Sequence, residues 1–499
     1  MPSVLAIDQG TTGSTCLVVS KDGRIIGRGY REIPQHYPQP GWVEHDPRDL
    51  LDRTVEAARE AIAKAGTTPD AIGITNQRET VVLWERKTGE PIGRAIVWQD
   101  RRTAERCLEL APEADRIARL TGLVTDPYFS GTKLEWMLRD DSVRRRAMRG
   151  ELAAGTVDSW LIWSLTRGAV HATDPTNASR TMLYDINTRA WSDELCDLLH
   201  VPRALLPGVR SSSGEFGVAD PAFLGKALPI MGVAGDQQAA LFGQGCHSPG
   251  TSKNTYGTGA FLLLNTGSQR AEGGGGLLTT IACDAVGRPA YALEAAIFIA
   301  GAAIQWLRDG LGILTTAAES EAAARAIAST DGVYFVPALV GMGAPHWEPR
   351  ARGTIVGLTR GTTSAHLVRA ALEAMAYSTA DILDVMRARA GRGAGGFSAE
   401  RNAPLRVDGG ATENDWLMQF QADVLGVPVE RPDQIETTAL GAAGLAGLAA
   451  GIWPNVDAFQ ATRKFTRFEP GEGRETARAG AAGWARAVRA TLSWARDAS

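Results

Sequence analysis

Short apolar stretches that end abruptly in polar residues recur along this chain. Stretches of this kind, bounded by glycine and polar residues, are typical of buried strands that run into turns. Four of them are followed by acidic or amide side chains: residues 4–7 by Asp8, 71–75 by the run 76–80, 229–235 by Asp236, and 405–407 by Asp408. Ligands of open α/β sheets bind beyond strand ends, so the pattern predicts a site assembled from several turns.

The first 75 residues alternate between strand and helix patterns. Residues 4–9 and 16–20 are expected to pair, and Asp22-Gly23 forms a tight turn before a third strand over 25–30. A helix is expected to begin at Asp46-Pro47, before the strand 71–75. An antiparallel start followed by alternating helices and strands predicts an α/β domain with a mixed sheet.

Residues 251–265 repeat the opening pattern of the chain. A polar strand, the turn Tyr256-Gly257-Thr258-Gly259 and an apolar strand follow one another there. The repeat indicates a duplicated domain, with an N-terminal domain over residues 1–245 and a C-terminal domain over 246–499. Residues 295–307 are expected to form a helix with Gly301 and Gln305 on one face.

The length, net charge and cysteine content of the chain argue against several classes of protein. A chain of 499 residues suggests two large domains. Its net charge of −4 offers no basic field, which disfavours nucleic acid as a partner. Five scattered cysteines without a C-x-x-C pair indicate neither a disulfide framework nor a zinc site, so a cytoplasmic location is expected. The apolar run 439–453 is shorter than the roughly 20 residues of a membrane span and is expected to be a buried helix, without stable membrane association.

The first turn carries groups that suit a phosphate. Gly10 and Gly13 allow close approach of the backbone, and the hydroxyls of Thr11 and Thr12 can donate to phosphate oxygens. Asp8, directly before this turn, could face a magnesium ion. The alternative is an ordinary hairpin in which Asp8 only ends the strand.

Other strand ends carry groups that suit hydroxyls and a flat ring. Arg78 and Glu79 can act as donor and acceptor for hydroxyl groups, or can belong to a solvated hairpin. Asp236 can cap the helix that follows it and can also accept a proton from a substrate hydroxyl. Tyr128 could wall a pocket or be a structural tyrosine. Gly409-Gly410 either lets backbone approach a flat ligand such as adenosine or makes a tight turn.

Seven ordered motifs resemble the FGGY family of carbohydrate kinases, and within it the members that act on glycerol. They are DQGTT at 8–12, GITNQRET at 73–80, IVWQDRR at 96–102, DPYFSGTK at 126–133, AGDQQAALFGQ at 234–244, NTYGTG at 254–259 and VDGGA at 407–411. The resemblance implies an actin-like, ribonuclease-H-like α/β fold of two domains, each a mixed five-stranded sheet flanked by helices, with a cleft between them. It implies phosphorylation of glycerol with ATP and Mg²⁺, release of ADP, and a homo-oligomer, dimer or tetramer.

The resemblance also implies roles for individual residues. Around glycerol it places Arg78, Glu79, Trp98, Tyr128, Asp236, Gln237 and Phe261, with Asp236 as the catalytic base. At the nucleotide, together with Gly13 of the first turn, it places Thr11, Thr12, Thr258, Gly301, Gln305, Gly410 and Asn414. Asp8 would lie near the magnesium ion.

Two features depart from the family pattern. Thr15 stands where members that act on glycerol usually carry an arginine, which leads us to expect weaker nucleotide affinity. Residues 220–229 lack the glycine-rich stretch with which some members bind a sugar bisphosphate regulator, so that regulation is not predicted.

Two other functions remain open from the residues. One is a kinase of the same fold that acts on another polyol or a ketose, such as erythritol or xylulose. The other is an actin-like ATPase that serves as a scaffold or chaperone, which would need no hydroxyl-binding group of residues.

Overall fold

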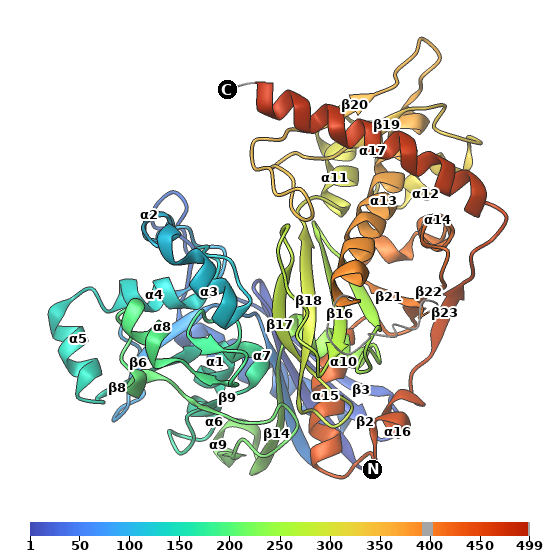
Figure 1. The fold of residues 1–499 in the computed structure, drawn as a ribbon. Coiled ribbons are helices and arrows are strands. Elements are labelled where there is room, and N and C mark those ends of the chain that lie inside the picture. Colours follow the sequence, from blue (N-terminus) through green and yellow to red (C-terminus); the bar gives the residue numbers. More distant parts are fainter. Residues whose placement is uncertain (392–402, 498–499) are drawn as a thin grey trace. The chain divides into compact units, whose positions relative to one another are not determined.

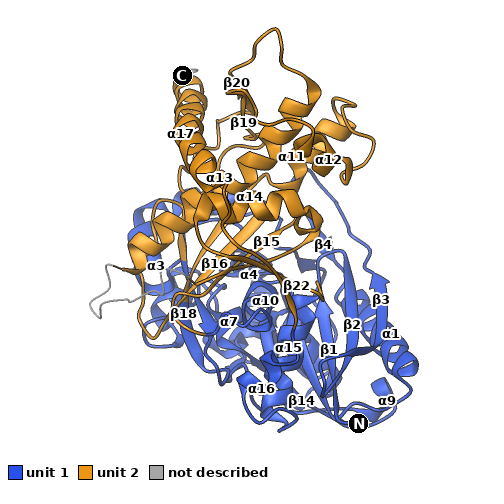
Figure 2. Ribbon diagram, turned by 90° about the vertical axis from the view of Figure 1, so that its right-hand side faces the viewer, with its two compact units in different colours: residues 1–247, 279–291, 436–463 blue, residues 248–278, 292–435, 464–499 orange. Residues whose placement is uncertain are grey.

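The chain divides into two compact units, each built from segments that are distant in sequence. In the computed structural model, which describes residues 1–391 and 403–497, unit 1 comprises Met1–His247, Thr279–Tyr291 and Glu436–Arg463. Unit 2 comprises Ser248–Leu278, Ala292–Ile435 and Lys464–Ser499 (Figure 2). The division differs from the predicted boundary at 245/246, because Glu436–Arg463 packs with the N-terminal part of the chain.

Unit 1 is organised around a six-stranded mixed sheet with the order β13-β14-β5-β1-β2-β3. Its strands are β1 (Ser3–Gln9), β2 (Gly13–Ser20), β3 (Ile25–Glu32), β5 (Ala71–Asn76), β13 (Val218–Ala219) and β14 (Leu228–Gly235). β1, β2 and β3 are antiparallel, whereas β1, β5 and β14 run parallel. A second, four-stranded sheet contains β4 (Glu44–His45), β6 (Val81–Glu85), β7 (Ala95–Ile96) and β8 (Leu152–Thr156).

Helices cover both faces of the six-stranded sheet because the buried strand residues alternate between two apolar cores. Leu5 and Ile7 pack with residues of α1 (Pro47–Ala65) and α6 (Val157–Leu165). Val4 and Ala6 pack with residues of α10 (Asp236–Gly243) and α15 (Thr437–Ala449). α15 thus lies against β1, β5 and β14, which confirms the predicted buried helix and accounts for the return of the chain to unit 1 (Figure 1).

Unit 2 contains most of a seven-stranded mixed sheet of order β17-β18-β16-β15-β21-β22-β23, although most of β17 and the start of β18 fall within Thr279–Tyr291, which is assigned to unit 1. Its strands are β15 (Ser252–Tyr256), β16 (Ala260–Gly267), β17 (Leu278–Cys283), β18 (Pro289–Ile297), β21 (Leu405–Asp408), β22 (Val429–Pro432) and β23 (Phe465–Phe468). Its helices include α11 (Gly301–Asp309), α12 (Glu319–Arg325), α13 (Ser364–Ala390), α14 (Asp415–Leu425) and α17 (Arg474–Asp497). Side chains from these elements form one large apolar core.

The α/β class, the mixed sheets and the opening hairpins of both halves are as predicted, and two details are corrected. The sheets have six and seven strands instead of five, and their edge strands include the two-residue β13 in the first sheet and β17 and β23 in the second. The helix expected over 295–307 begins only at Gly301, because residues 295–297 continue β18. None of the helices in the described ranges combines the length and apolar character that a membrane span requires.

We predict that Gly441→Ala destabilises the protein through the contact between α15 and α10. A Cβ atom on Gly441 would lie 1.8 Å from the carbonyl oxygen of Ala239, so the two helices would have to separate. We expect a loss of about 1–3 kcal/mol or more, seen as a drop of several degrees in the thermal midpoint by calorimetry. The control is Gly361→Ala, where the nearest atom is 3.8 Å away. Equal midpoints for the two variants would contradict the packing argument.

Candidate active site

Three parallel strands of unit 1 bring the predicted charged residues to one edge of the sheet. The strands are neighbours in the order β14-β5-β1. Asp8 lies near the end of β1, and Arg78 and Glu79 follow the end of β5. Asp236 follows the end of β14 directly. Because the ends of neighbouring parallel strands coincide, residues far apart in sequence meet at this edge.

Arg78 lies at the centre of this group. Its Nε is 3.2 Å from the Asp236 carboxylate and 3.8 Å from that of Glu79. Its Nη1 donates to Oε1 of Gln238 at 3.1 Å, and its Nη2 donates to the Tyr128 hydroxyl at 3.5 Å. The side chains of Arg78 and Glu79 are 2% exposed, whereas that of Asp236 is 33% exposed. The solvated-hairpin alternative for Arg78 and Glu79 is therefore wrong, and the Asp236 carboxylate is the member of the group that reaches solvent.

Glu79 is held in an unusual conformation. Its φ is 62°, in the left-handed region that residues with a side chain seldom occupy. The Nε of Arg180, a fully buried arginine, donates to Oε1 of Glu79 at 2.7 Å. A strained backbone that is retained beside a buried ion pair is typical of a functional site.

Two aromatic side chains lie beside the charged group. The rings of Trp98 and Tyr128 meet edge to face, with centroids 5.6 Å apart. The indole Nε1–H of Trp98 donates to the hydroxyl of Thr11 at 2.9 Å. This bond joins Thr11, which is predicted to contact the nucleotide, to Trp98, which is predicted to contact glycerol. Trp98 and Tyr128 together offer an apolar wall next to donors and acceptors for hydroxyls.

Asp236 is the first residue of α10 and not its N-cap, which is Gly235. The Asp236 carboxylate accepts a hydrogen bond from the backbone N–H of Gln237 at 2.6 Å. A helix N-terminus stabilises negative charge. The residue thus combines the helix-end position expected from the sequence with an accessible carboxylate that is stabilised as an anion.

Asp8 is more difficult to ionise. Burial, and secondarily the charge of Asp236, raise the pKa of Asp8 to about 7. Thr15 lies opposite Asp8 in the β1–β2 ladder, at the position where the family pattern has an arginine. In the described ranges no group of three or more acidic, histidine or cysteine side chains could hold a metal by itself. Mg²⁺ is usually bound through one or two carboxylates together with waters and substrate phosphates, so a single carboxylate at Asp8 fits that mode.

A cavity of about 500 Å³ in unit 2 collects the predicted nucleotide residues of the second half of the chain. Its lining includes Thr258, Gly301, Gln305, Gly410 and Asn414. Its apolar wall is formed by Ile304, Ala317, Ala318, Leu372, Met375 and Ala411. An apolar wall with a few polar groups suits an adenine ring.

Glycines shape this cavity. Gly301 begins α11, and a Cβ there would lie 2.6 Å from the carbonyl oxygen of Gly257. The carbonyls of Gly257 and Thr258 accept hydrogen bonds from the backbone N–H groups of Gly301 and Ala302, both at 3.0 Å. Gly410 differs, because a Cβ there would have no atom within 4 Å and would face open space. The turn after β15 is thus fixed to the start of α11, while Gly410 leaves room at the cavity.

The remaining predicted residues are Thr12, Gly13, Gln237 and Phe261. Thr12 is exposed in the first turn, and Gly13 begins β2 in a buried position where a Cβ would lie 2.6 Å from the Tyr30 ring. Gln237 is partly exposed in α10. Phe261 lies on β16 in unit 2, whereas the other residues predicted for glycerol lie in unit 1.

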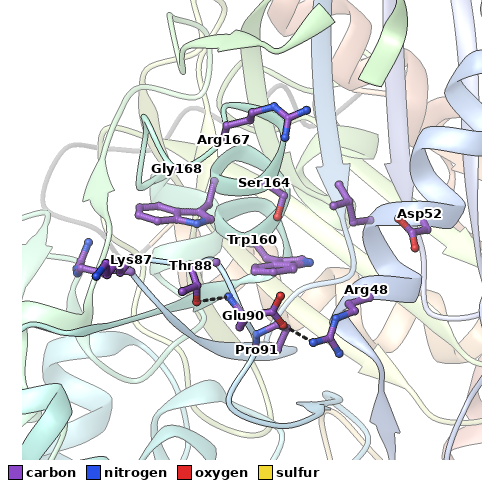
Figure 3. Close-up of a pocket in the computed structure, with 14 residues that line it drawn as sticks. Arg48, Asp52, Lys87, Thr88, Glu90, Pro91, Trp160, Ser164, Arg167 and Gly168 are labelled. Carbon is purple, nitrogen blue, oxygen red and sulfur yellow. Dashed lines mark hydrogen bonds and ion pairs between the residues drawn. The ribbon is translucent and has the colours of Figure 1, made fainter. Parts of the chain in front are cut away.

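A second cavity, of about 400 Å³, lies in unit 1 between the start of α1, residues 86–91 and α6 (Figure 3). None of the predicted site residues lines it. Two of its arginines form ion pairs within the protein: Arg48 pairs with Glu90, and Arg167 with Asp220. Figure 3 shows the Arg48–Glu90 contact. This cavity is therefore separate from the candidate site.

Sequence reasoning missed three side chains that contact the candidate site. Arg180 binds Glu79, Gln238 binds Arg78, and the hydroxyl of Thr176 accepts a hydrogen bond from the backbone N–H of Gly235. Arg180 and Thr176 belong to the polar run DPTNASR at 174–180, which is buried throughout. The feature of the sequence that could have revealed these residues is the length of this polar run, which lies between apolar segments.

Comparison with known proteins identifies the class to which this fold and site belong. Residues 3–243 match the N-terminal domain of the FGGY family of carbohydrate kinases, and residues 252–450 match its C-terminal domain. The chain belongs to this family, and the resemblance of its motifs is confirmed.

The individual proteins that the chain resembles are glycerol kinases. It is 52% identical to the glycerol kinase of Burkholderia pseudomallei and 53% identical to that of Chromobacterium violaceum, with 99% of each chain covered. The structure of Plasmodium falciparum glycerol kinase with ADP matches with a TM-score of 0.91 and 34% identity, over 99% of this chain and 98% of that chain. A xylulose kinase from Lactobacillus acidophilus, at 20% identity and a TM-score of 0.85, shares the fold.

We predict that Asp8→Asn stabilises the protein above neutral pH. The pKa of Asp8 is about 7 in the folded protein, against an ordinary value of 3.8 in the unfolded chain. Between pH 3.8 and about pH 7, the Asp8 carboxyl keeps its proton in the folded state and loses it in the unfolded chain. The contribution of Asp8 to stability therefore falls as the pH rises. Thermal midpoints should be higher for the variant at about pH 8 and should converge toward about pH 4. A difference that stays constant with pH would contradict the raised pKa.

We also predict that Gly410→Val weakens nucleotide binding without unfolding the protein. The new side chain would enter the cavity of unit 2 because nothing occupies the space at Gly410. We expect an affinity for ADP that is lower by about tenfold or more in isothermal titration calorimetry. Gly361→Val serves as the control, because that exposed turn lies outside the cavity. An unchanged affinity would exclude this cavity as the nucleotide site.

Proposed function

We propose that this protein catalyses the transfer of the γ-phosphoryl group of MgATP to the terminal hydroxyl of glycerol, which gives sn-glycerol 3-phosphate and ADP. The observation that carries the proposal is the group formed by Arg78, Glu79 and Asp236 beside Trp98 and Tyr128. These residues offer donors and acceptors for three hydroxyls and an aromatic wall for a short carbon chain. The glycerol kinases among the relatives support the same substrate.

Asp236 is the base in this proposal. Its carboxylate is the accessible one in the group, and Arg78 and the N–H of Gln237 hold it in place. It would take the proton of the attacking hydroxyl as the new bond forms between the glycerol oxygen and the γ-phosphorus. The bond from that phosphorus to the oxygen of ADP breaks, and ADP leaves. Positioning and charge neutralisation supply most of the catalysis in such a transfer.

Charge at the phosphates would be neutralised from two sides. Asp8 would hold Mg²⁺, which supplies neutralisation of the phosphate charge when it is bound with the nucleotide. The hydroxyls and backbone N–H groups of the first turn, around Thr11 and Thr12, would contact the phosphates. In unit 2, the cavity with Gln305, Gly410 and Asn414 would hold the adenosine part.

We predict that the purified protein releases ADP from ATP in proportion to added glycerol. A coupled assay should give a kcat/KM for glycerol at least about 100-fold above the values for erythritol and xylulose, because a site built for three hydroxyls on a short chain excludes longer ones. Asp236→Asn should lower kcat by about 10²–10⁴-fold and leave glycerol binding in calorimetry largely intact. ATP hydrolysis unaffected by any polyol would instead indicate an ATPase of the same fold, and faster turnover of xylulose would indicate a ketose kinase.

A further inference from the structure

The segment 174–180, DPTNASR, is polar in sequence and buried in the structure. It contains the short helix α7 (Pro175–Ala178), and each of its residues is shielded from solvent. Buried polar groups are costly unless they are hydrogen-bonded, so a buried polar segment must have partners that justify its position. Its partners are found at the ends of the strands that carry the candidate site.

Arg180 is the strongest of these links. Its side chain is 0% exposed, and its Nε donates to the Glu79 carboxylate, itself 2% exposed, at 2.7 Å. Its guanidinium lies 5.7 Å from the ring centroid of Tyr128 and 5.1 Å from that of Phe129. The planar guanidinium thus contacts an acceptor and the aromatic wall of the candidate site at once.

Two further links hold the ends of β14 and β5. The hydroxyl of Thr176 accepts a hydrogen bond at 2.8 Å from the backbone N–H of Gly235, which directly precedes Asp236. The side-chain amides of Asn177 and Asn76 bind each other reciprocally, at 3.0 and 3.1 Å. Asn76 is the last residue of β5, two positions before Arg78. The segment therefore contacts the chain on either side of the proposed substrate contacts.

We propose that Arg180 is a positioning residue for the kinase reaction: it fixes the Glu79 carboxylate so that this group accepts a hydrogen bond from one hydroxyl of the substrate. This inference rests on the proposed function. Glu79 has a φ of 62°, a backbone conformation that persists only where the surrounding structure supports it, and its buried carboxylate needs a cation beside it. Arg180 supplies that cation at 2.7 Å, whereas Arg78 is 3.8 Å from Glu79 and closer, at 3.2 Å, to Asp236.

Removing Arg180 should therefore reduce the ability of the site to distinguish glycerol from an analogue that lacks one hydroxyl. A site that hydrogen-bonds a substrate hydroxyl rejects an analogue that lacks it, because a buried acceptor is then left unpaired. If Arg180 orients that acceptor, removing Arg180 harms glycerol more than it harms the analogue without the corresponding hydroxyl. A residue that only stabilises the fold would lower turnover of all substrates in parallel.

The test measures kcat and KM of Arg180→Met and Arg180→Lys with glycerol, propane-1,2-diol and propane-1,3-diol. For Arg180→Met we expect the preference for glycerol over at least one diol to fall by about 10- to 100-fold, through KM more than through kcat. Arg180→Lys keeps the charge without the planar fork and should recover part of the preference.

The control is Arg369→Met in unit 2. Arg369 forms a similar ion pair, with its Nε 2.9 Å from Glu373 and its guanidinium 4.9 Å from the Trp416 ring centroid. It should lower the thermal midpoint and leave the ratio of glycerol to diol turnover unchanged. Parallel losses on all three substrates in Arg180→Met would overturn the proposal, and if that variant does not fold, parallel losses in Arg180→Lys would do so. A wild-type protein that does not phosphorylate glycerol would instead overturn the proposed function.

Discussion

The candidate site depends on the pairing of buried charges. Arg78, Glu79 and Arg180 are almost completely removed from solvent, and a single buried ion without a partner would cost several kcal/mol. Each therefore lies beside an opposite charge, and this requirement fixes the orientation of the side chains around Asp236. Breaking one pair would leave a buried charge without a partner. That energetic penalty holds the paired side chains in place and makes the network rigid. That rigidity suits a site that must select among small hydroxylated molecules.

The two units carry candidate binding surfaces of different chemical kinds. Unit 1 places charged and aromatic side chains at strand ends, and their directed donors and acceptors suit the hydroxyls of the proposed substrate. Unit 2 offers an apolar wall, glycines and a few amides around a cavity of about 500 Å³, which suits a flat ring. In the proposed function the duplicated fold thus serves two tasks, because the turns after corresponding strands carry different residues.

Strand-end residues were predictable, whereas their supporting partners were not. Asp8, Arg78, Glu79 and Asp236 each follow an apolar run, and the ends of neighbouring parallel strands coincide, so local pattern was enough to group them. Arg180 lies 101 residues from Glu79, and only the tertiary fold decides that the two pair. The start of α11 at Gly301 was missed because an apolar run such as 295–300 fits a strand or a helix equally well. The motifs indicated the fold class, but an edge strand of two residues such as β13 is too short to leave a pattern.

The return of Glu436–Arg463 to unit 1 has a consequence for the synthesis of the protein. The sheet face formed by Val4, Ala6 and their neighbours is covered by α15, which is encoded near the end of the chain. A nascent chain emerging from the ribosome cannot complete unit 1 until α15 has been translated. Meanwhile an apolar sheet face stays uncovered, which exposes the chain to aggregation and favours help from chaperones. Because α15 is translated late, unit 1 cannot finish folding before most of unit 2 has been synthesised.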